Sequence, residues 1–317
     1  MGPLCITTGG IVWTGMEELV SRAIARVPGW RESDLVVTPI TGGITNTSYL
    51  VKRRANDSTE AFVLRIGGKT ASSLGIDRHR ELAAMRVVER IDLGAPLVFA
   101  DPGADILVTR FVGGGQFRFG EPPSTSAMQR AARAVRRIHE AAAFDGTFSP
   151  FETVRTYSRT AAEHGGLIDA AGPALELSAS LERMLSPDLP ACPCHNDLLP
   201  ANILDDAGHL RIIDWEYAAM GDRWFDLGNL AANLELSDDG IFDLLTAYLE
   251  RAPLPVEMAR VTAMTVVSDL REGFWALVQR GQSSIDFDFD EYAKKHLERA
   301  LRRSTEGPIQ AAHRTLA

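Results

Sequence analysis

The chain has 317 residues, of which 45% are hydrophobic and 24% are charged, as is ordinary for a globular protein with a sizeable core. Acidic residues outnumber basic ones by 42 to 33, and the formal charge of −9 argues against a nucleic-acid partner, which requires a basic surface. The sequence has no run of 18 apolar residues, so it predicts no membrane span. Its three cysteines do not make a disulfide framework, which favours the cytoplasm.

The first third of the chain predicts a β-rich unit with one main helix. An N-terminal leader without the basic start of a signal peptide precedes a helix expected over residues 16–26. A second helix is expected over residues 78–91, because Leu82, Met85 and Val88 lie on one face. Alternating and β-branched residues predict strands at 35–40, 48–51, 61–66, 97–99 and 106–109.

The remainder of the chain, after the glycine run at 113–115, predicts a mostly helical unit. Apolar residues at helical spacing predict helices at 128–142, 174–185, 241–251, 256–280 and 290–304. We therefore expect an α+β fold with two lobes, residues 16–112 forming the small one and residues 113–305 the large one. The sequence does not indicate an oligomeric state.

One stretch between these helices carries a chemical pattern. Asp197 lies five residues before Asn202, and Asp214 follows the apolar run of residues 211–213. In phosphoryl transfer from Mg-ATP, an Asp accepts the proton of the substrate hydroxyl, and an Asn and a second Asp bind Mg²⁺. Short strands around a turn at 205–208 would form a hairpin that returns Asn202 and Asp214 to the same end. The spacing therefore predicts a kinase.

Two further features in the β-rich unit fit nucleotide binding. A loop with Gly42 and Gly43 allows backbone N–H groups close to phosphate oxygens, with Thr45 and Asn46 as additional donors, although such loops are also plain hairpin turns. Arg65 lies in an apolar strand and needs a partner, for which Glu81 on the following helix is suitable. Such a pair aims a cation at the phosphates. The alternative is an edge-strand arginine that extends to solvent.

Taken together, these segments resemble the choline/ethanolamine kinases, in particular their bacterial branch. That family lies within the aminoglycoside-phosphotransferase-like superfamily, which has a bilobal protein-kinase-like fold. The resemblance extends from about Met16 to Arg303. The matching segments are residues 40–46, 63–66, 195–204, 213–217, 225–229, 275–279 and 283–287.

The resemblance implies a role for each matching residue. It implies that Asp197 is the catalytic base, that Asn202 and Asp214 bind Mg²⁺, and that Arg65 and the Gly42–Gly43 loop bind the phosphates of ATP. An arginine in place of the usual kinase lysine is itself a feature of choline kinases. His195 and Asp226 would support the catalytic loop. Adenine would bind hinge backbone at Thr109, Arg110, Phe111 and Val112.

The acceptor site is implied in the same way. A quaternary ammonium binds to aromatic faces and carboxylates, and Trp275 and Tyr292 match aromatic positions of the family's choline pocket, although core packing is an alternative role. Glu216 could supply a carboxylate. Glu272 replaces a tryptophan of the eukaryotic enzymes and Asn233 replaces a pocket glutamate. The pocket would then be thinner, or completed by Trp215, Trp224 or Tyr217.

We therefore expect an ATP- and Mg²⁺-dependent kinase that phosphorylates a primary hydroxyl of a cationic amino alcohol, choline first and ethanolamine second. Thiamine or an aminoglycoside is the alternative acceptor. A nucleotide-binding regulator without catalysis is a second hypothesis, and the intact set of Asp197, Asn202 and Asp214 argues against it. The absence of Asp-Phe-Gly and Ala-Pro-Glu words argues against a protein kinase.

Overall fold

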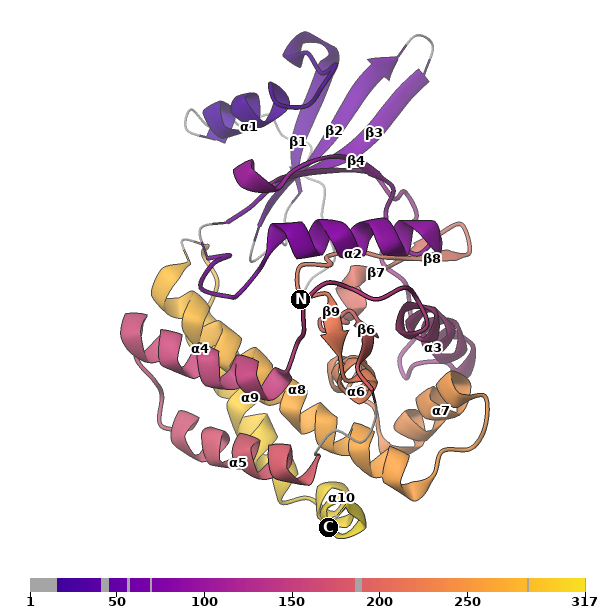
Figure 1. Cartoon of the computed structure of the whole chain (residues 1–317), viewed down its shortest axis with the longest axis vertical. Coiled ribbons are helices and arrows are strands. Elements are labelled where there is room, and N and C mark those ends of the chain that lie inside the picture. The colour runs from indigo at the N-terminus through magenta and orange to yellow at the C-terminus, as the bar shows by residue number, and fades with distance from the viewer. Residues whose placement is uncertain are drawn as a thin grey trace.

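The computed structural model describes residues 16–40, 46–55, 58–68, 70–185, 190–283 and 285–316. This part of the chain has the two predicted lobes, a small one built on a β-sheet and a large helical one below it (Figure 1). Helix α2 (Arg78–Arg90) lies between the sheet and the helical lobe. The lobe boundary at residues 112 and 113 stays a prediction.

The small lobe contains an antiparallel sheet in the order β1-β2-β3-β5-β4. On one face, Val51, Phe62, Leu64 and Val108 are buried and belong to the same cluster as Ala23 of the first helix. Because side chains alternate along a strand, Arg65 lies on the opposite face from Leu64, toward α2. The elements are α1 (Met16–Ile24), β1 (Leu35–Ile40), β2 (Thr47–Ala55), β3 (Ser58–Ile66), β4 (Leu97–Asp101) and β5 (Ile106–Arg110).

Helix α2 begins at a capped position and carries a polar residue on its buried face. The Asp77 carboxylate accepts hydrogen bonds from the backbone N–H groups of His79 and Arg80, which are otherwise unsatisfied in the first turn. Glu81 is buried with Met85 and Val88. The cap therefore fixes the start of a helix whose inner face presents a carboxylate to the sheet.

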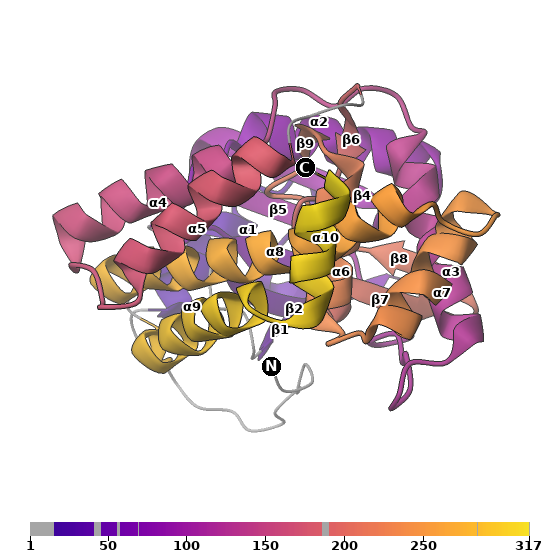
Figure 2. The same cartoon turned by 90° about the horizontal axis from the view of Figure 1, so that it is seen from below.

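The large lobe is organised around one long helix, α8 (Pro255–Gln282), which is buried from Ala259 to Gln279. Figure 2 shows α8 running between the other helices, which bury it on all sides. The remaining helices are α3 (Thr125–His139), α4 (Pro150–His164), α5 (Ala171–Met184), α6 (Arg223–Asn233), α7 (Asp238–Leu249), α9 (Phe289–Ser304) and α10 (Gly307–Leu316).

Three of these helices, α4, α6 and α10, are not among those predicted from the sequence, and the bounds of the others shift. The helix expected at 128–142 begins at Thr125, because the Ser124 hydroxyl caps it, and ends at His139. Helix α6 is buried from Trp224 to Ala232, and the polar side that carries Asp226 and Asn229 lies in the interior and not toward solvent.

Short strands frame the segment that contains the predicted catalytic residues. Strand β6 (Cys192–Cys194) pairs with β9 (Ala219–Gly221), and β7 (Ile203–Asp206) pairs with β8 (His209–Ile212). The predicted hairpin around residues 205–208 is therefore confirmed. The backbone N–H of Ile212 donates to the carbonyl oxygen of Leu93, which ties this hairpin to the end of α2. The hairpin thus lies where the two lobes meet.

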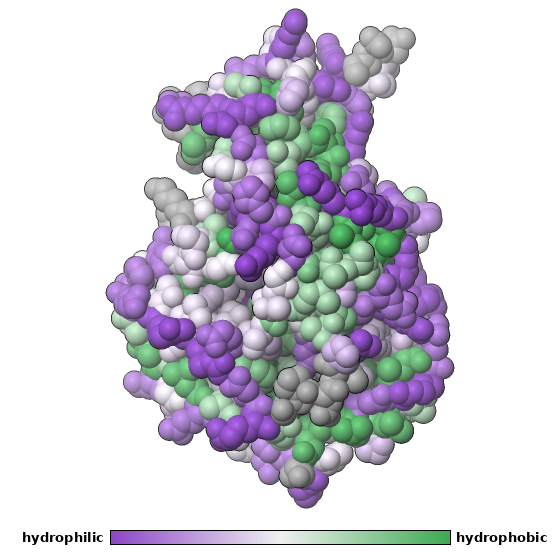
Figure 3. Space-filling model, in the orientation of Figure 1, coloured by the Kyte–Doolittle hydropathy of each residue, from purple (hydrophilic) through white to green (hydrophobic). Residues whose placement is uncertain are grey.

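The visible surface mixes hydrophilic and hydrophobic residues, and the molecule narrows between the lobes (Figure 3). Across the described ranges, no helix has the length and apolarity needed to cross a membrane.

Candidate active site

A buried carboxylate holds the loop between β6 and β7. Asp226, on α6, accepts hydrogen bonds from the backbone N–H groups of His195 (2.8 Å) and Asn196 (2.7 Å). His139 Nε2 lies 3.1 Å from the same carboxylate. Asn196 has a φ of +63°, a left-handed conformation that asparagine adopts more readily than most residues. The predicted link from Asp226 to the catalytic loop is therefore present.

His195 joins this loop to the segment that contains Asp214. Its Nε2 lies 3.0 Å from the carbonyl oxygen of Ile213, so Nε2 carries the proton and donates. Nδ1 then accepts from the backbone N–H of Asp197 at 3.2 Å. Burial lowers the pKa of His195, more than the nearby Asp226 and Asp197 raise it. The imidazole therefore stays neutral and acts as a fixed brace between the two segments.

Asp197 is buried with a cationic neighbour. The residue is 7% exposed, and its Oδ1 accepts a hydrogen bond of 2.7 Å from Arg271 Nη1. Burial raises the pKa of Asp197, and the Arg271 guanidinium offsets part of that effect. Asn202 Nδ2 donates to the backbone oxygen of Asp197 at 3.1 Å, which fixes the amide and leaves its oxygen available.

Asp214 lies beside Asn202 and is poorly partnered. The backbone N–H of Ile213 donates to the carbonyl oxygen of Asn202 at 2.9 Å, so the two predicted metal ligands are joined through adjacent backbone. Asp214 has a φ of +67°, which is uncommon for aspartate and is typical of strained functional positions. Burial and the neighbouring Glu216 raise its pKa well above the usual range, and Arg65 opposes them from 3.8 Å.

The predicted pairing of Arg65 with Glu81 is present. Two parallel hydrogen bonds, from Nη1 at 2.5 Å and Nη2 at 2.6 Å, join the guanidinium to the carboxylate. Burial works against both charges, but Glu81 raises the pKa of Arg65 and Arg65 lowers that of Glu81, so both remain ionised. A bidentate pair is rigid, and this one holds a cation within 3.8 Å of Asp214.

Arg78 belongs to the polar network around Glu81 and Glu216, and the sequence did not predict it. Its Nη1 lies 3.0 Å from Glu81 and 3.0 Å from Glu216, and Nε lies 2.6 Å from Asp105. Its Nη2 donates to Asn46 Oδ1 at 2.8 Å. The signal in the sequence is weak, because these partners come from four separate segments. Arg78 thus joins the start of α2 to Asn46 and to the segment after Asp214.

The glycine-rich loop is described only at its end. Gly42, Gly43 and Thr45 lie outside the described residues. Asn46 is described, and its Nδ2 donates to Glu216 Oε2 at 3.0 Å. Glu216 therefore makes its polar contacts toward the small lobe, with Asn46 and Arg78, rather than toward Trp275 and Tyr292.

The expected adenine-binding segment comprises the last two residues of β5 and the two residues after it. The backbone N–H of Phe111 donates to Ala61 and that of Arg110 to Pro96, and Val112 packs against Leu204. The Arg110 side chain pairs with Glu60 at 2.8 Å, away from Asp197. With Thr109 in the last pairs of the sheet, opposite Val63, this segment is a fixed backbone connection between the lobes.

The chain matches the family model described as "Phosphotransferase enzyme family" over residues 36–261. The chain belongs to this family. This phosphotransferase is 26% identical over 280 residues to Protein LicA of Haemophilus influenzae, covering 84% of this chain and 79% of the relative. It is 26% identical over 309 residues to a probable ethanolamine kinase A of Dictyostelium discoideum, covering 86% and 87%.

Solved structures give the same result. A choline/ethanolamine kinase family protein from Mesorhizobium loti matches with a TM-score of 0.78 and 25% identity, covering 95% of this chain and 99% of that one. Spectinomycin phosphotransferase matches with a TM-score of 0.57 and 14% identity over 84% of this chain and 93% of its own, which shows a shared fold. The predicted choline/ethanolamine kinase likeness, the bilobal kinase-like fold and the assignment as an enzyme acting on an alcohol are confirmed.

Beyond Arg271 and Glu272, the phosphotransferase carries an aromatic cluster. The ring centroids of Trp275 and Tyr292 lie 6.1 Å apart in an edge-to-face arrangement, and Phe287 and Phe289 lie beside them. The Tyr292 hydroxyl donates to Glu272 Oε2 at 3.0 Å, and this carboxylate contributes, after burial, to a raised pKa of the tyrosine. The two predicted aromatic residues are therefore brought together around Glu272.

Two of the other suggested aromatic residues belong to the core. The Trp215 ring packs against Phe144 and His195, and Trp224 is buried within the main hydrophobic cluster, so neither can complete a pocket. Tyr217 is different, because the guanidinium carbon of Arg271 lies 4.4 Å from its ring centroid. Asn233 donates to the backbone of Asn229 and makes its contact there.

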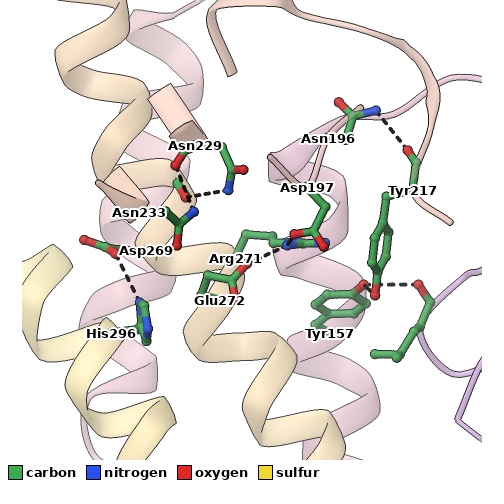
Figure 4. A network of polar contacts seen from close by, with 12 residues as sticks. Tyr157, Asn196, Asp197, Tyr217, Asn229, Asn233, Asp269, Arg271, Glu272 and His296 are labelled. Carbon is green, nitrogen blue, oxygen red and sulfur yellow. Dashed lines mark hydrogen bonds and ion pairs between the residues drawn. The ribbon is translucent and has the colours of Figure 1, made fainter. Parts of the chain in front are cut away.

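Arg271 is the second residue that the sequence interpretation missed. It lies between Asp197 and Glu272, with Tyr217 and Tyr157 to one side (Figure 4). The available signal was the Arg271-Glu272 charge pair inside the long apolar segment that forms α8. A charge pair at the centre of a buried helix needs partners, and Asp197 is one of them.

Cys192 and Cys194, the end residues of β6, lie close to His139. Their ligand atoms and those of His139 lie within 4.8 Å of one another, and the two sulfurs are 3.7 Å apart. Both nitrogens of His139 already form hydrogen bonds, to Tyr248 and Asp226. The cluster therefore lies at the start of the loop between β6 and β7, directly before His195.

Proposed function

We propose that this phosphotransferase uses Mg²⁺ and ATP to phosphorylate the hydroxyl of a small cationic amino alcohol. Among simple acceptors we rank choline first and ethanolamine second. The observation that carries the proposal is the position of Asp197, a buried carboxylate held by the clamped catalytic loop, next to Asn202 and the Arg65–Asp214 pair. The kinship with an ethanolamine kinase and with a choline/ethanolamine kinase family protein supports the class of acceptor.

The donor set suits Mg²⁺. Hard divalent cations bind oxygen, and Asn202 offers its amide oxygen while its Nδ2 is engaged. In the described part of the chain, Asp214 has one ion-pair partner, Arg65, at 3.8 Å, which is beyond hydrogen-bond distance. Desolvation and the neighbouring Glu216 raise the pKa of Asp214, and a divalent cation bound there would favour the ionised carboxylate. Asn202 and Asp214 would hold Mg²⁺, which would supply positive charge to neutralise the phosphates.

The protein's own residues then have separate tasks. Asp197 accepts the proton of the acceptor hydroxyl as the hydroxyl oxygen attacks the γ-phosphorus of ATP, and the bond from that phosphorus to ADP breaks. Arg65, aimed by Glu81, binds the phosphates and neutralises charge on the transferred group. Asn46 with the Gly42, Gly43 and Thr45 loop would cover the phosphates, and the backbone of Thr109 to Val112 would bind adenine. Trp275 and Tyr292 would face the ammonium group.

An acceptor panel tests the proposal. ADP release is measured with Mg²⁺-ATP and choline, ethanolamine, thiamine or an aminoglycoside, with and without EDTA. We expect saturable release with choline and ethanolamine that EDTA abolishes and excess Mg²⁺ restores. Saturation by thiamine at far lower concentration than choline would overturn the ranking, and ADP release that survives chelation would overturn the metal assignment.

The proposed compartment is the cytoplasm. The sequence has three cysteines, an odd and sparse set that forms no disulfide framework, which fits a reducing environment.

A further inference from the structure

Arg271 is buried next to Asp197, the proposed base, and not all of its guanidinium nitrogens have hydrogen-bond partners among the described residues. Its side chain is 2% exposed, and Nη1 lies 2.7 Å from Asp197 Oδ1 and 2.5 Å from Glu272 Oε1. Placing a guanidinium in a protein interior is costly unless each donor finds an acceptor. The two carboxylates account for Nη1 alone.

Nε and Nη2 of Arg271 have no hydrogen-bond partner among the described residues, although both are buried. These two nitrogens form one edge of the guanidinium, and their N–H bonds point in the same direction. That edge is the one that binds a carboxylate through two parallel hydrogen bonds. An unsatisfied buried donor in a native protein indicates a ligand or a bound water.

The surroundings of Arg271 resemble those of a bound cationic ligand. An aromatic face, that of Tyr217, lies 4.4 Å from the guanidinium carbon, and two carboxylates flank it. A simple quaternary ammonium would compete with this internal cation for the same groups. An acceptor that also carries an anionic group gains from Arg271 instead of competing with it.

We propose that Arg271 binds a carboxylate of the acceptor, so that the preferred acceptor is a hydroxylated amino acid rather than the corresponding amine. This inference rests on the proposed kinase function and names its substrate class. The carboxylate binds the Nε–Nη2 edge, and the Nη1 contact to Asp197 places the neighbouring hydroxyl at the base. Glu272, held by Tyr292, offers the remaining carboxylate for the ammonium group.

The test compares acceptor pairs that differ by one carboxylate. Serine is ethanolamine with an added carboxylate, and N,N,N-trimethylserine is choline with a carboxylate added at the same carbon. We measure kcat/KM for all four with the full chain, Mg²⁺ and ATP. We expect the carboxylated member of at least one pair to be preferred by roughly tenfold to a hundredfold, the gain typical of hydrogen bonds to a charged group.

The Arg271→Lys variant assigns that preference to the guanidinium edge. Lysine keeps a positive charge near Asp197 but lacks the planar fork. We expect the ratio of the two kcat/KM values within the preferred pair to fall by about tenfold. Damage to Asp197 would lower both members alike and leave the ratio unchanged. Arg299→Lys, which alters an arginine paired with Asp269 elsewhere on the helical lobe, is the matched control and should leave the ratio unchanged.

The outcomes separate this inference from the proposed function. If both amines are phosphorylated at least as well as their carboxylated partners, the carboxylate assignment is wrong and the kinase proposal stands. If no acceptor releases ADP, the kinase proposal fails, and calorimetry of the same pairs decides the role of Arg271. Equal Kd values for serine and ethanolamine would then refute it, with water as the partner of Nε and Nη2. Tighter binding of serine that Arg271→Lys removes would support it.

Discussion

Replacing Glu81 by glutamine tests whether the buried pair with Arg65 both stabilises the small lobe and positions the phosphate-binding cation. Glutamine has nearly the same shape but no charge, so Arg65 and Arg78 lose their shared carboxylate. Removing one partner of a buried ion pair costs about 3–5 kcal/mol. We expect about 3 kcal/mol, because the glutamine carbonyl can still accept from one of the two arginines.

The effect of Glu81→Gln should depend on pH in a defined direction. Burial raises the pKa of Glu81, but Arg65 and Arg78 lower it by more, so the pKa lies below its ordinary value of 4.5. The stabilisation by this carboxylate is therefore present above pH 4.5 and is lost as the pH falls through its folded-state pKa. The difference in unfolding free energy between parent and variant should be largest near neutral pH and should shrink in acid.

Urea unfolding and steady-state kinetics measure the two effects. A loss of about 3 kcal/mol lowers the urea midpoint by roughly 1 M at a slope of about 3 kcal/mol per M. KM for ATP should rise and kcat should fall, since Arg65 is no longer aimed at the phosphates. Glu60→Gln is the matched control, because Glu60 also contacts two arginines, Arg53 and Arg110, but at the surface. Equal midpoints and equal turnover for parent and Glu81→Gln would refute the reasoning.

Three further predictions follow from the catalytic loop and the helix packing. Asp197→Asn should lower kcat by about 10²- to 10⁴-fold with little change in ATP affinity, and retained turnover would show that another group is the base. Burial lowers the pKa of His195 below its ordinary 6.5. The parent should therefore lose unfolding free energy relative to His195→Asn as the pH falls below 6.5, by at most about 1.4 kcal/mol per pH unit. Parallel plots of unfolding free energy against pH for the two proteins would contradict this. A Cβ at Gly228 would lie 2.5 Å from Met264 Cβ, so Gly228→Ala should lower the unfolding free energy in urea by about 1–3 kcal/mol. Gly172 has open space around it, so Gly172→Ala should leave the unfolding free energy unchanged. Equal effects of the two substitutions would argue against the close approach of α6 to α8.

Local patterns allowed the sequence to predict much of the fold. The strands of the small lobe, α2 and the β7–β8 hairpin have one-sided or alternating apolar residues bounded by turn residues, and these signals are short in range. The Arg65–Glu81 pair was predicted because a charge inside an apolar strand requires a partner on the next element. Helix α6 was missed because it is short and contains Gly228 and two asparagines, which are residues of low helix propensity.

The polar network between the lobes could not be predicted in the same way. Arg78 contacts Glu216, 138 residues away, and Arg271 contacts Asp197, 74 residues away. Neither arginine lies in a motif, and each position is set by how separate elements pack. Trp215 is the reverse case. Its place after Asp214 suggested a residue of the acceptor pocket, but its ring packs against Phe144 and His195. A single sequence therefore identified the chemistry better than the shape of the acceptor site.

Helix α8 supplies interior packing for the large lobe along its whole buried length and also carries Arg271, Glu272 and Trp275. Any exchange of acceptor during evolution would have to alter side chains that are simultaneously part of the protein's interior. Such changes would reduce thermal tolerance until neighbouring helices adjusted, so a broadened substrate range in this protein should arise together with compensating substitutions on α4, α6 or α9.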